Sequence, residues 1–312
     1  MPRKPPQPLA SAPLAYENPA FLNSPDGRII RILSEYSEPL ARFRREHIRD
    51  TVVFFGSARF HALDEANHDL ELLENTGSMQ RAPEHEQPVR IADIPHGTPS
   101  ELSLRRARAA VEMAHYYEDA RRLAFLLTQW SRTLKSRRHR FVVTSGGGPG
   151  IMEAANRGAY EAGGKTIGLN IRLPFEQYPN PYITPSLNFE FHYFFMRKYW
   201  FAYLAKALVV FPGGFGTLDE MFEILTLAQT QKLAKKMPVI LYGSSYWNEV
   251  INLDVLVDKG TIAPRDRELF QPAETPDQAF ALLKEGLTQY HLEAEAAHAE
   301  SDEAPEIART RK

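Results

Sequence analysis

The chain has 312 residues, of which 43% are hydrophobic, and its 37 basic and 39 acidic residues give a formal net charge of −2. This length is enough to bury a sizeable core, and the near-neutral charge argues against a general nucleic-acid binder, because phosphate contacts need a basic excess. The chain has no cysteine, which excludes disulfides, thiolate zinc sites, iron–sulfur clusters and a cysteine nucleophile.

The N-terminal residues 1–25 are rich in proline, and we expect them to form a flexible arm. No apolar run in the chain approaches the roughly 20 residues that span a bilayer. No apolar stretch long enough for a signal peptide follows the first basic residues. The sequence therefore predicts a soluble, cytoplasmic protein that contacts neither membrane nor nucleic acid.

Residues 28–49 have apolar side chains at helical spacing, which predicts one or two helices packed on the domain. The run Thr51–Phe55 is β-branched and aromatic and ends at Gly56, as is typical of a buried parallel strand followed by a turn. Residues 61–113 are charged and broken by prolines, so we expect a surface insertion that is helical in part. An amphipathic helix is expected next, over Tyr116–Leu134.

Strands and helices then alternate along the chain. The expected elements are, in order, strand Phe141–Thr144, helix Gly150–Ala162, strand Thr166–Asn170, helix His192–Leu204, strand Ala207–Phe211, helix Leu218–Lys232, strand Val239–Leu241, helix Tyr246–Asp258 and helix Pro276–Tyr290. This alternation predicts an α/β fold, a doubly wound parallel sheet with helices on both faces. We expect one domain over 26–290 and a disordered, acidic tail over 291–312.

The first chemical motif is Thr144–Gly150, which reads TSGGGPG between an expected strand and an expected helix. The glycines let backbone N–H groups approach a ligand, and the helix N-terminus has a partial positive charge. These features favour a phosphate or another anion. The alternative interpretation is a sharp strand-to-helix turn that simply needs glycine. The candidate ligand-binding residues here are Gly146, Gly147, Gly148, Gly150 and, in the first helical turn, Glu153.

The second motif is Pro212–Glu220, which reads PGGFGTLDE and also follows an apolar strand. Its candidate binding residues are Gly213, Gly214, Gly216 and Thr217. Glu220 has two interpretations. The spacing of Thr217 and Glu220 fits a capping box, in which each side chain bonds the backbone of the other. A carboxylate one turn into such a helix could equally face a ligand, as expected of a catalytic group.

The third motif is the pair Arg197–Lys198 on an expected helix. The residues three and four positions from Arg197 are all aromatic: Tyr193, Phe194, Trp200 and Phe201. An arginine on an aromatic face needs a partner, because burying its charge alone is costly. It can form a structural ion pair or stack on the rings, or it can grip a phosphate or carboxylate through two hydrogen bonds.

Two other nucleotide-site patterns fail. Residues 163–166 read GGKT, but Ala159 occupies the glycine position that a P-loop requires, and the order of helix and strand is reversed. The dinucleotide fingerprint is absent after the first strand, which disfavours an NAD-dependent oxidoreductase. The ten histidines do not cluster at ligand spacing, so we expect neither a metal nor a cofactor.

The segments TSGGGPGIMEAANRGAYEAGG, FFMRKYWF and VVFPGGFGTLDEMFEIL together resemble the LOG family, Rossmann-like nucleotide phosphoribohydrolases first associated with cytokinin activation. The resemblance covers roughly residues 50–290. It implies hydrolysis of the N-glycosidic bond of a nucleoside 5′-monophosphate, AMP or an N6-modified AMP, to a free base and ribose 5-phosphate.

The resemblance also implies roles for individual residues. Arg197 and Glu220 become the catalytic pair, while the glycine loops, Lys198 and the early turn Gly56-Ser57 become the substrate site. A homodimer or higher homo-oligomer is implied as well, because family members complete their sites across a dimer interface. Met196 departs from the cytokinin-activating pattern, which has glutamate there. Relatives that carry cofactors without hydrolysis keep a non-hydrolytic nucleotide- or cofactor-binding protein as the alternative.

Overall fold

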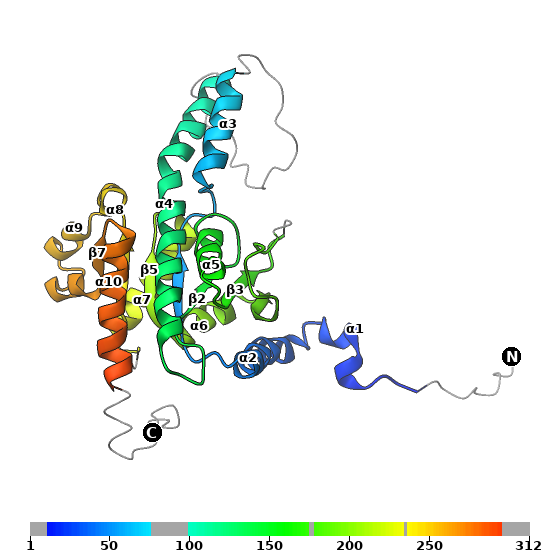
Figure 1. Cartoon of the computed structure of the whole chain (residues 1–312). Coiled ribbons are helices and arrows are strands. Elements are labelled where there is room, and N and C mark those ends of the chain that lie inside the picture. The colour runs from blue at the N-terminus through cyan, green and yellow to red at the C-terminus, as the bar shows by residue number, and fades with distance from the viewer. Residues whose placement is uncertain (1–10, 76–98, 175–177, 234–235, 295–312) are drawn as a thin grey trace, which may run out of the picture.

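The computed structural model describes residues 11–75, 99–174, 178–233 and 236–294. Within these residues the chain forms one parallel sheet of seven strands in the order β4-β3-β2-β1-β5-β6-β7 (Figure 1). The strands are β1 Thr51–Phe55, β2 Val142–Ser145, β3 Thr166–Ile171, β4 Asn188–Phe191, β5 Ala205–Val210, β6 Val239–Tyr242 and β7 Gln271–Ala273. The predicted doubly wound α/β fold is confirmed.

Helices cover both faces of the sheet, so its central strands are buried on both sides. One face packs against α4, α5 and α10, and the other against α2, α6 and α7. The helices are α1 Pro19–Leu22, α2 Arg28–Arg45, α3 Leu63–Asn75, α4 Pro99–Thr133, α5 Ile151–Glu161, α6 Phe194–Leu204, α7 Phe215–Gln229, α8 Ser244–Val250, α9 Leu253–Asp258 and α10 Pro276–Leu287.

The central strands lie where their apolar runs predicted, because every residue of β1, β2 and β6 is buried. The two edge strands are absent from the sequence prediction. β4 mixes polar and apolar residues, and β7 is three residues long with Pro272 at its centre. An edge strand needs only one partner, so it tolerates a proline and a mixed pattern.

The expected insertion differs from the structure at its C-terminal end. Helix α4 begins at Pro99 rather than at Tyr116, so residues 99–113 belong to the same continuous helix as the residues that cover the sheet. Proline is suited to a first helical position, where its missing N–H has no partner to lose. Helix α3 lies alongside the N-terminal half of α4, and the two stand out from the sheet (Figure 1). Residues 76–98 lie outside the described residues.

The ends of the chain also differ from expectation. Within the expected arm 1–25, the described residues include a 3₁₀ turn, Ala15–Glu17, and helix α1. At the other end, a π-helical turn, Thr288–Glu293, continues α10. His291 is buried, with its Nε2 3.2 Å from the carbonyl oxygen of Lys206. The described part of the expected tail, 291–294, therefore packs on the domain at His291, and residues 295–312 lie outside the described residues.

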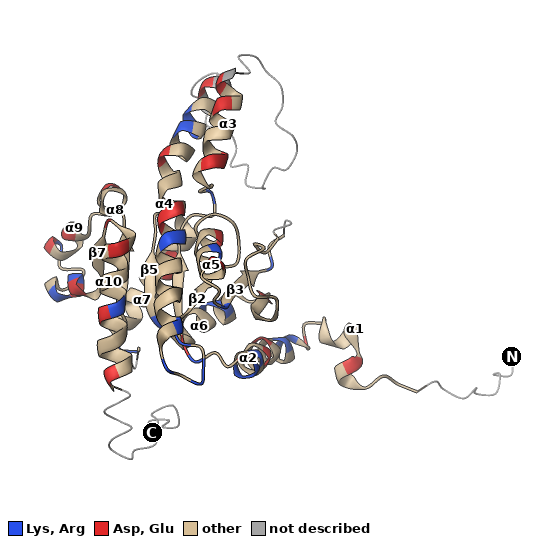
Figure 2. Ribbon diagram, viewed as in Figure 1, with Lys and Arg blue, Asp and Glu red and all other residues tan. Residues whose placement is uncertain are grey.

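Acidic and basic side chains are interspersed along α4 and α10 (Figure 2). Among the helices of the described residues, none is long and apolar enough to cross a membrane. No group of three or more His, Asp or Glu side chains in the same residues is arranged to hold a metal ion.

Candidate active site

The strand order reverses between β1 and β5, which lie side by side in the sheet. The chain proceeds from β1 toward β4 on one side and from β5 toward β7 on the other. In open α/β sheets, ligands bind at the carboxyl ends of the strands at this reversal. The turn at Gly56-Ser57, the loop 146–150 and the loop 212–214 follow β1, β2 and β5. The early turn and both predicted glycine loops therefore meet at the carboxyl ends of the central strands.

Ser57 joins the two glycine loops. Its backbone N–H donates to the carbonyl oxygen of Pro212 at 2.9 Å, and its carbonyl oxygen accepts from the N–H of Ile151 at 3.0 Å. Gly56 packs directly on the helix that follows the first loop, since a Cβ built there would lie 2.6 Å from Cγ2 of Ile151. The turn at Gly56-Ser57 therefore contacts both the second glycine loop and the helix that follows the first, and fixes their relative position.

The first glycine loop is buried, and its packing alone requires glycine. Gly147 and Gly150 have φ values of +77° and +71°, and a Cβ at Gly150 would lie 2.3 Å from the carbonyl oxygen of Ser57. The loop is held from behind by Asn180, whose Nδ2 donates to the carbonyl oxygens of Gly147 and Gly148 at 3.1 Å each. The requirement for a sharp turn is therefore met here, and anion binding by this loop stays a prediction.

Asn180 has no counterpart in the sequence prediction. It lies after β3, outside every motif, and it also donates to Oδ1 of Asn156 at 2.9 Å in a buried polar network. Tyr246 of α8 is a second residue that sequence reasoning missed, and its hydroxyl donates to the carbonyl oxygen of Gly213 at 2.9 Å. Neither contact has a local sequence signal, because each joins segments that are distant along the chain.

The second glycine loop is open on its outer side. Gly213 is buried, but a Cβ built at Gly214 or at Gly216 would meet nothing within 4 Å. Phe215, between them, is 91% exposed. The start of α7 is therefore exposed on this side, and an exposed helix N-terminus is suited to binding a phosphate.

The predicted capping box is wrong. Helix α7 begins at Phe215 with Gly214 as its N-cap, and no side chain caps it. Thr217 is then the third helical residue and Glu220 the sixth, so neither can bond the other's backbone at the helix start. Glycine is an acceptable N-cap residue, which lets the helix begin before Thr217. With its capping role removed, Glu220 has no local structural reason to be acidic.

Glu220 is buried beside the predicted arginine. Glu220 is 5% exposed, and its Oε1 lies 4.0 Å from Nη2 of Arg197, too far for a hydrogen bond. Burial raises the pKa of Glu220 to about 7, while Lys198 and Arg197 lower it. A carboxyl group with this pKa exchanges protons near neutral pH, as a general acid or base must.

Arg197 of α6 lies between the two halves of the site. Its guanidinium stacks over the rings of Phe194 and Phe201, with 5.3 and 5.6 Å from Cζ to the ring centroids. A Cβ built at Gly146 would lie 3.9 Å from its Nη1. Its Nε is buried and has no hydrogen-bond acceptor among the described residues. The stacking interpretation is confirmed, and a buried donor remains for a ligand oxygen.

Lys198 points to the neighbouring helix. Its Nζ lies 2.7 Å from Oε2 of Glu223, 2.8 Å from Oδ2 of Asp219 and 4.0 Å from Oε2 of Glu220, all on α7. The structure therefore gives the predicted substrate-binding lysine three protein carboxylates as neighbours.

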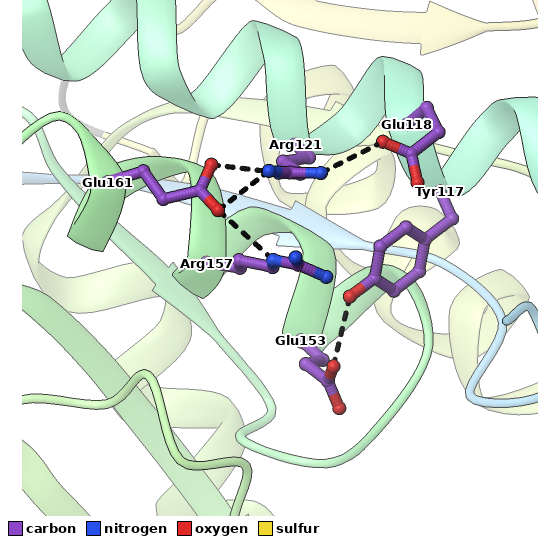
Figure 3. A network of polar contacts seen from close by, with 6 residues as sticks. All are labelled: Tyr117, Glu118, Arg121, Glu153, Arg157 and Glu161. Carbon is purple, nitrogen blue, oxygen red and sulfur yellow. Dashed lines mark hydrogen bonds and ion pairs between the residues drawn. The ribbon is translucent and has the colours of Figure 1, made fainter. Parts of the chain in front are cut away.

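Glu153 lies at the end of a polar network that ties α4 to α5 (Figure 3). The hydroxyl of Tyr117 donates to its Oε1 at 2.9 Å. Farther along, Arg157 and Arg121 both pair with Glu161. The hydrogen-bond partner of Glu153 is thus on α4, on the opposite face of the sheet from Arg197 and Glu220.

The fold and site define a doubly wound α/β protein with a candidate active site at the reversal of strand order. Residues 152–283 match a family model described as "Possible lysine decarboxylase". A probable cytokinin riboside 5′-monophosphate phosphoribohydrolase from Oryza sativa subsp. japonica is 28% identical over 48% of this chain and 70% of its own length. A cytokinin riboside 5′-monophosphate phosphoribohydrolase from Arabidopsis thaliana is 30% identical over 42% of this chain and 58% of its own. The predicted resemblance to the LOG family is confirmed.

Among solved structures, this chain is similar to a molybdenum cofactor binding protein from Rippkaea orientalis, at 22% identity and a TM-score of 0.38. The match covers 55% of this chain and 86% of that chain. It is also similar to the molybdenum cofactor carrier protein from Chlamydomonas reinhardtii, at 23% identity, a TM-score of 0.37, and 56% and 89% coverage.

Proposed function

We propose that the protein is a nucleoside 5′-monophosphate phosphoribohydrolase. Its substrate is AMP or an N6-modified AMP, and its products are the free base and ribose 5-phosphate. The observation that carries the proposal is Glu220, a buried carboxyl group with a pKa of about 7 that no hydrogen bond ties to its neighbour Arg197. Such a group at the reversal of strand order is suited to proton transfer or to stabilising positive charge.

The reaction explains why a carboxylate and an arginine lie together. Cleavage of the bond between C1′ and the base nitrogen develops positive charge on the ribose, as in glycoside hydrolysis. In its ionised form, Glu220 stabilises this charge and orients the water that adds to C1′, whose proton it accepts. The electrons of the broken bond remain on the base, which takes up a proton and leaves.

The start of α7 is the proposed phosphate site. Side chains would meet open space at Gly214 and Gly216, so the start of α7 is accessible, and the helix dipole favours an anion there. The buried Nε of Arg197 supplies a charged donor for a ligand oxygen. The first glycine loop, being buried, supports this site by packing through Ser57, while the substrate makes its own contacts with α7.

The names of the relatives support the same reaction, because they describe hydrolases of cytokinin riboside 5′-monophosphates. The substrate need not be a cytokinin here. Met196, in the position where the cytokinin-activating pattern has glutamate, is buried against the sheet. We therefore include unmodified AMP in the proposed substrate class.

The test is a screen of purified protein against nucleoside 5′-monophosphates, with release of the free base measured by chromatography. Adenine release from AMP, with stoichiometric ribose 5-phosphate, is the expected result. Binding of AMP without release of adenine, or of any other base in the screen, would reject hydrolysis and favour the non-hydrolytic carrier.

A further inference from the structure

We propose that Lys198 is a positioning residue that ties α6 to α7 through Asp219 and Glu223, and so holds Arg197 and Glu220 at their separation of 4.0 Å. This inference rests on the proposed function, because it assigns Lys198 a role in the same site. It replaces the role implied by the family resemblance, in which Lys198 binds the substrate.

The geometry of the ammonium group supports a tie. An ammonium group has three donors, and two of them face carboxylates at hydrogen-bond distance, Glu223 at 2.7 Å and Asp219 at 2.8 Å. The third neighbour is Glu220, at 4.0 Å. The group is thus surrounded by anions of the protein, and a substrate phosphate would add a fourth anion to this cluster.

Arg197 and Lys198 are adjacent in the chain but differ in what they offer a ligand. Arg197 has a buried Nε without an acceptor, whereas Lys198 is hydrogen-bonded to α7. Because the two residues share one turn of α6, fixing Lys198 against α7 also fixes the backbone that carries Arg197. The tie spans one helical turn of α7, from Asp219 to Glu223, with Glu220 between its ends.

The same tie sets the charge around Glu220. The charged groups that face this carboxyl are Arg197 and Lys198 from α6, and Asp219 and Glu223 from its own helix. The two cations lower the pKa of Glu220 and the two anions raise it. Burial also raises it, and its effect is larger than that of any of the four charges. Removing Lys198 therefore shifts the balance toward the protonated form, and removing its two partners shifts it toward the ionised form.

The experiment compares Lys198→Met, Lys198→Arg, the double variant Asp219→Asn/Glu223→Gln, and a matched control, Lys165→Met. Lys165 is also a partly buried lysine paired with a glutamate, Glu46 at 2.8 Å, but it lies immediately before β3 and its partner is the C-cap residue of α2. Two quantities are measured for each protein. One is the kcat and KM for AMP as a function of pH. The other is the titration of the Glu220 carboxyl by ¹³C NMR of glutamate-labelled protein, assigned with Glu220→Gln.

We expect Lys198→Met to lower kcat by about tenfold or more at unchanged KM, since a misplaced reacting group is costly. The pKa of Glu220 should rise in Lys198→Met and fall in the double variant, and kcat should fall in both. Lys198→Arg should keep much of the wild-type kcat. Lys165→Met should match the wild type in kcat and in the pKa of Glu220.

If Lys198 instead binds the substrate, the effects on KM should be different, and that result would overturn the proposal. Lys198→Met would then raise KM, and the double variant would free the lysine and lower KM. An unchanged Glu220 titration in Lys198→Met would also overturn it, because removing an ammonium group 4.0 Å from that carboxyl must change its titration. The NMR measurement needs no turnover, so a failure of hydrolysis in the wild type is recognised separately.

Discussion

Arg197 and Glu220 approach within 4.0 Å from two different helices, both are largely buried, and no hydrogen bond joins them. The distance matters because a direct bidentate pair would hold the carboxylate ionised and satisfy the guanidinium. Instead, burial raises the pKa of Glu220 to about 7 and lowers the pKa of Arg197. This arrangement supports the proposal that the pair acts on a third group, a substrate.

Replacing Glu220 by Gln should lower the rate of base release from AMP by about 100-fold or more, because the charge that faces the developing oxocarbenium ion is lost. AMP binding, measured by calorimetry, should persist, since the phosphate is bound by the start of α7. The exposed Glu249 of α8 gives a matched control, and Glu249→Gln should keep the wild-type rate. Near-normal turnover in Glu220→Gln would move the search for the catalytic carboxylate to Glu153.

The rate should rise with pH around neutrality. If the ionised form of Glu220 is the active one, kcat increases as this carboxyl loses its proton, with a midpoint near its pKa of about 7. The measurement is kcat for AMP between pH 5 and 9. The residual rate of Glu220→Gln supplies the baseline, because the substrate phosphate also titrates, near pH 6. A wild-type profile parallel to that baseline would contradict this assignment.

The stability of the wild type should fall relative to Glu220→Gln as pH rises from 5 to 8. The pKa of the folded protein, about 7, lies above the ordinary 4.5. The protonated carboxyl therefore contributes its full stabilisation at a pH where Glu220 is protonated in both the folded and the unfolded protein. This contribution is lost as the pH rises through the pKa of Glu220 in the folded protein. The free energy of unfolding of the wild type, relative to that of Glu220→Gln, should fall by on the order of 3 kcal/mol. The measurement is urea unfolding of both proteins at each pH. A difference that is constant with pH would show that the pKa is not raised.

The 5′-phosphate should be required, so adenosine should react far more slowly than AMP. Gly216→Leu tests the site directly, because a side chain there has open space and leaves the helix intact. We expect an unchanged melting temperature, a KM for AMP raised at least tenfold and no change in the slow reaction with adenosine. A KM for AMP like that of the wild type would place the phosphate elsewhere.

The protein should be at least a dimer. Helices α6 and α7 expose five large aromatic side chains: Phe194, Phe195, Tyr203, Phe215 and Phe222. We predict that they take part in a dimer interface, because large exposed apolar surface marks interaction sites. Phe195→Glu and Phe222→Glu should each halve the mass measured by light scattering at micromolar concentration. A monomeric wild type would contradict the prediction.

The alternation of apolar strands and amphipathic helices was enough to predict the doubly wound sheet. The sequence also predicted the two glycine loops, Arg197 and Glu220 as site residues. Their residue types and local spacing indicate a chemical role even when the tertiary contacts are unknown. The edge strands β4 and β7 and the supporting residues Asn180 and Tyr246 were not. Their contacts join segments far apart in the chain, and no local pattern marks them.

Tertiary structure alone decided the state of the site. Local spacing allowed Glu220 a capping role beside a catalytic one, and the family resemblance implied that Lys198 binds the substrate. The fold excludes the cap and surrounds Lys198 with carboxylates, which supports our proposal that this lysine is a positioning residue. Helix α7 begins at Phe215, which moves Glu220 away from the cap, and α6 lies against α7, which pairs Lys198 with Asp219 and Glu223. A sequence specifies which groups are present. Their burial, and therefore their pKa, depends on which helices the fold packs around them.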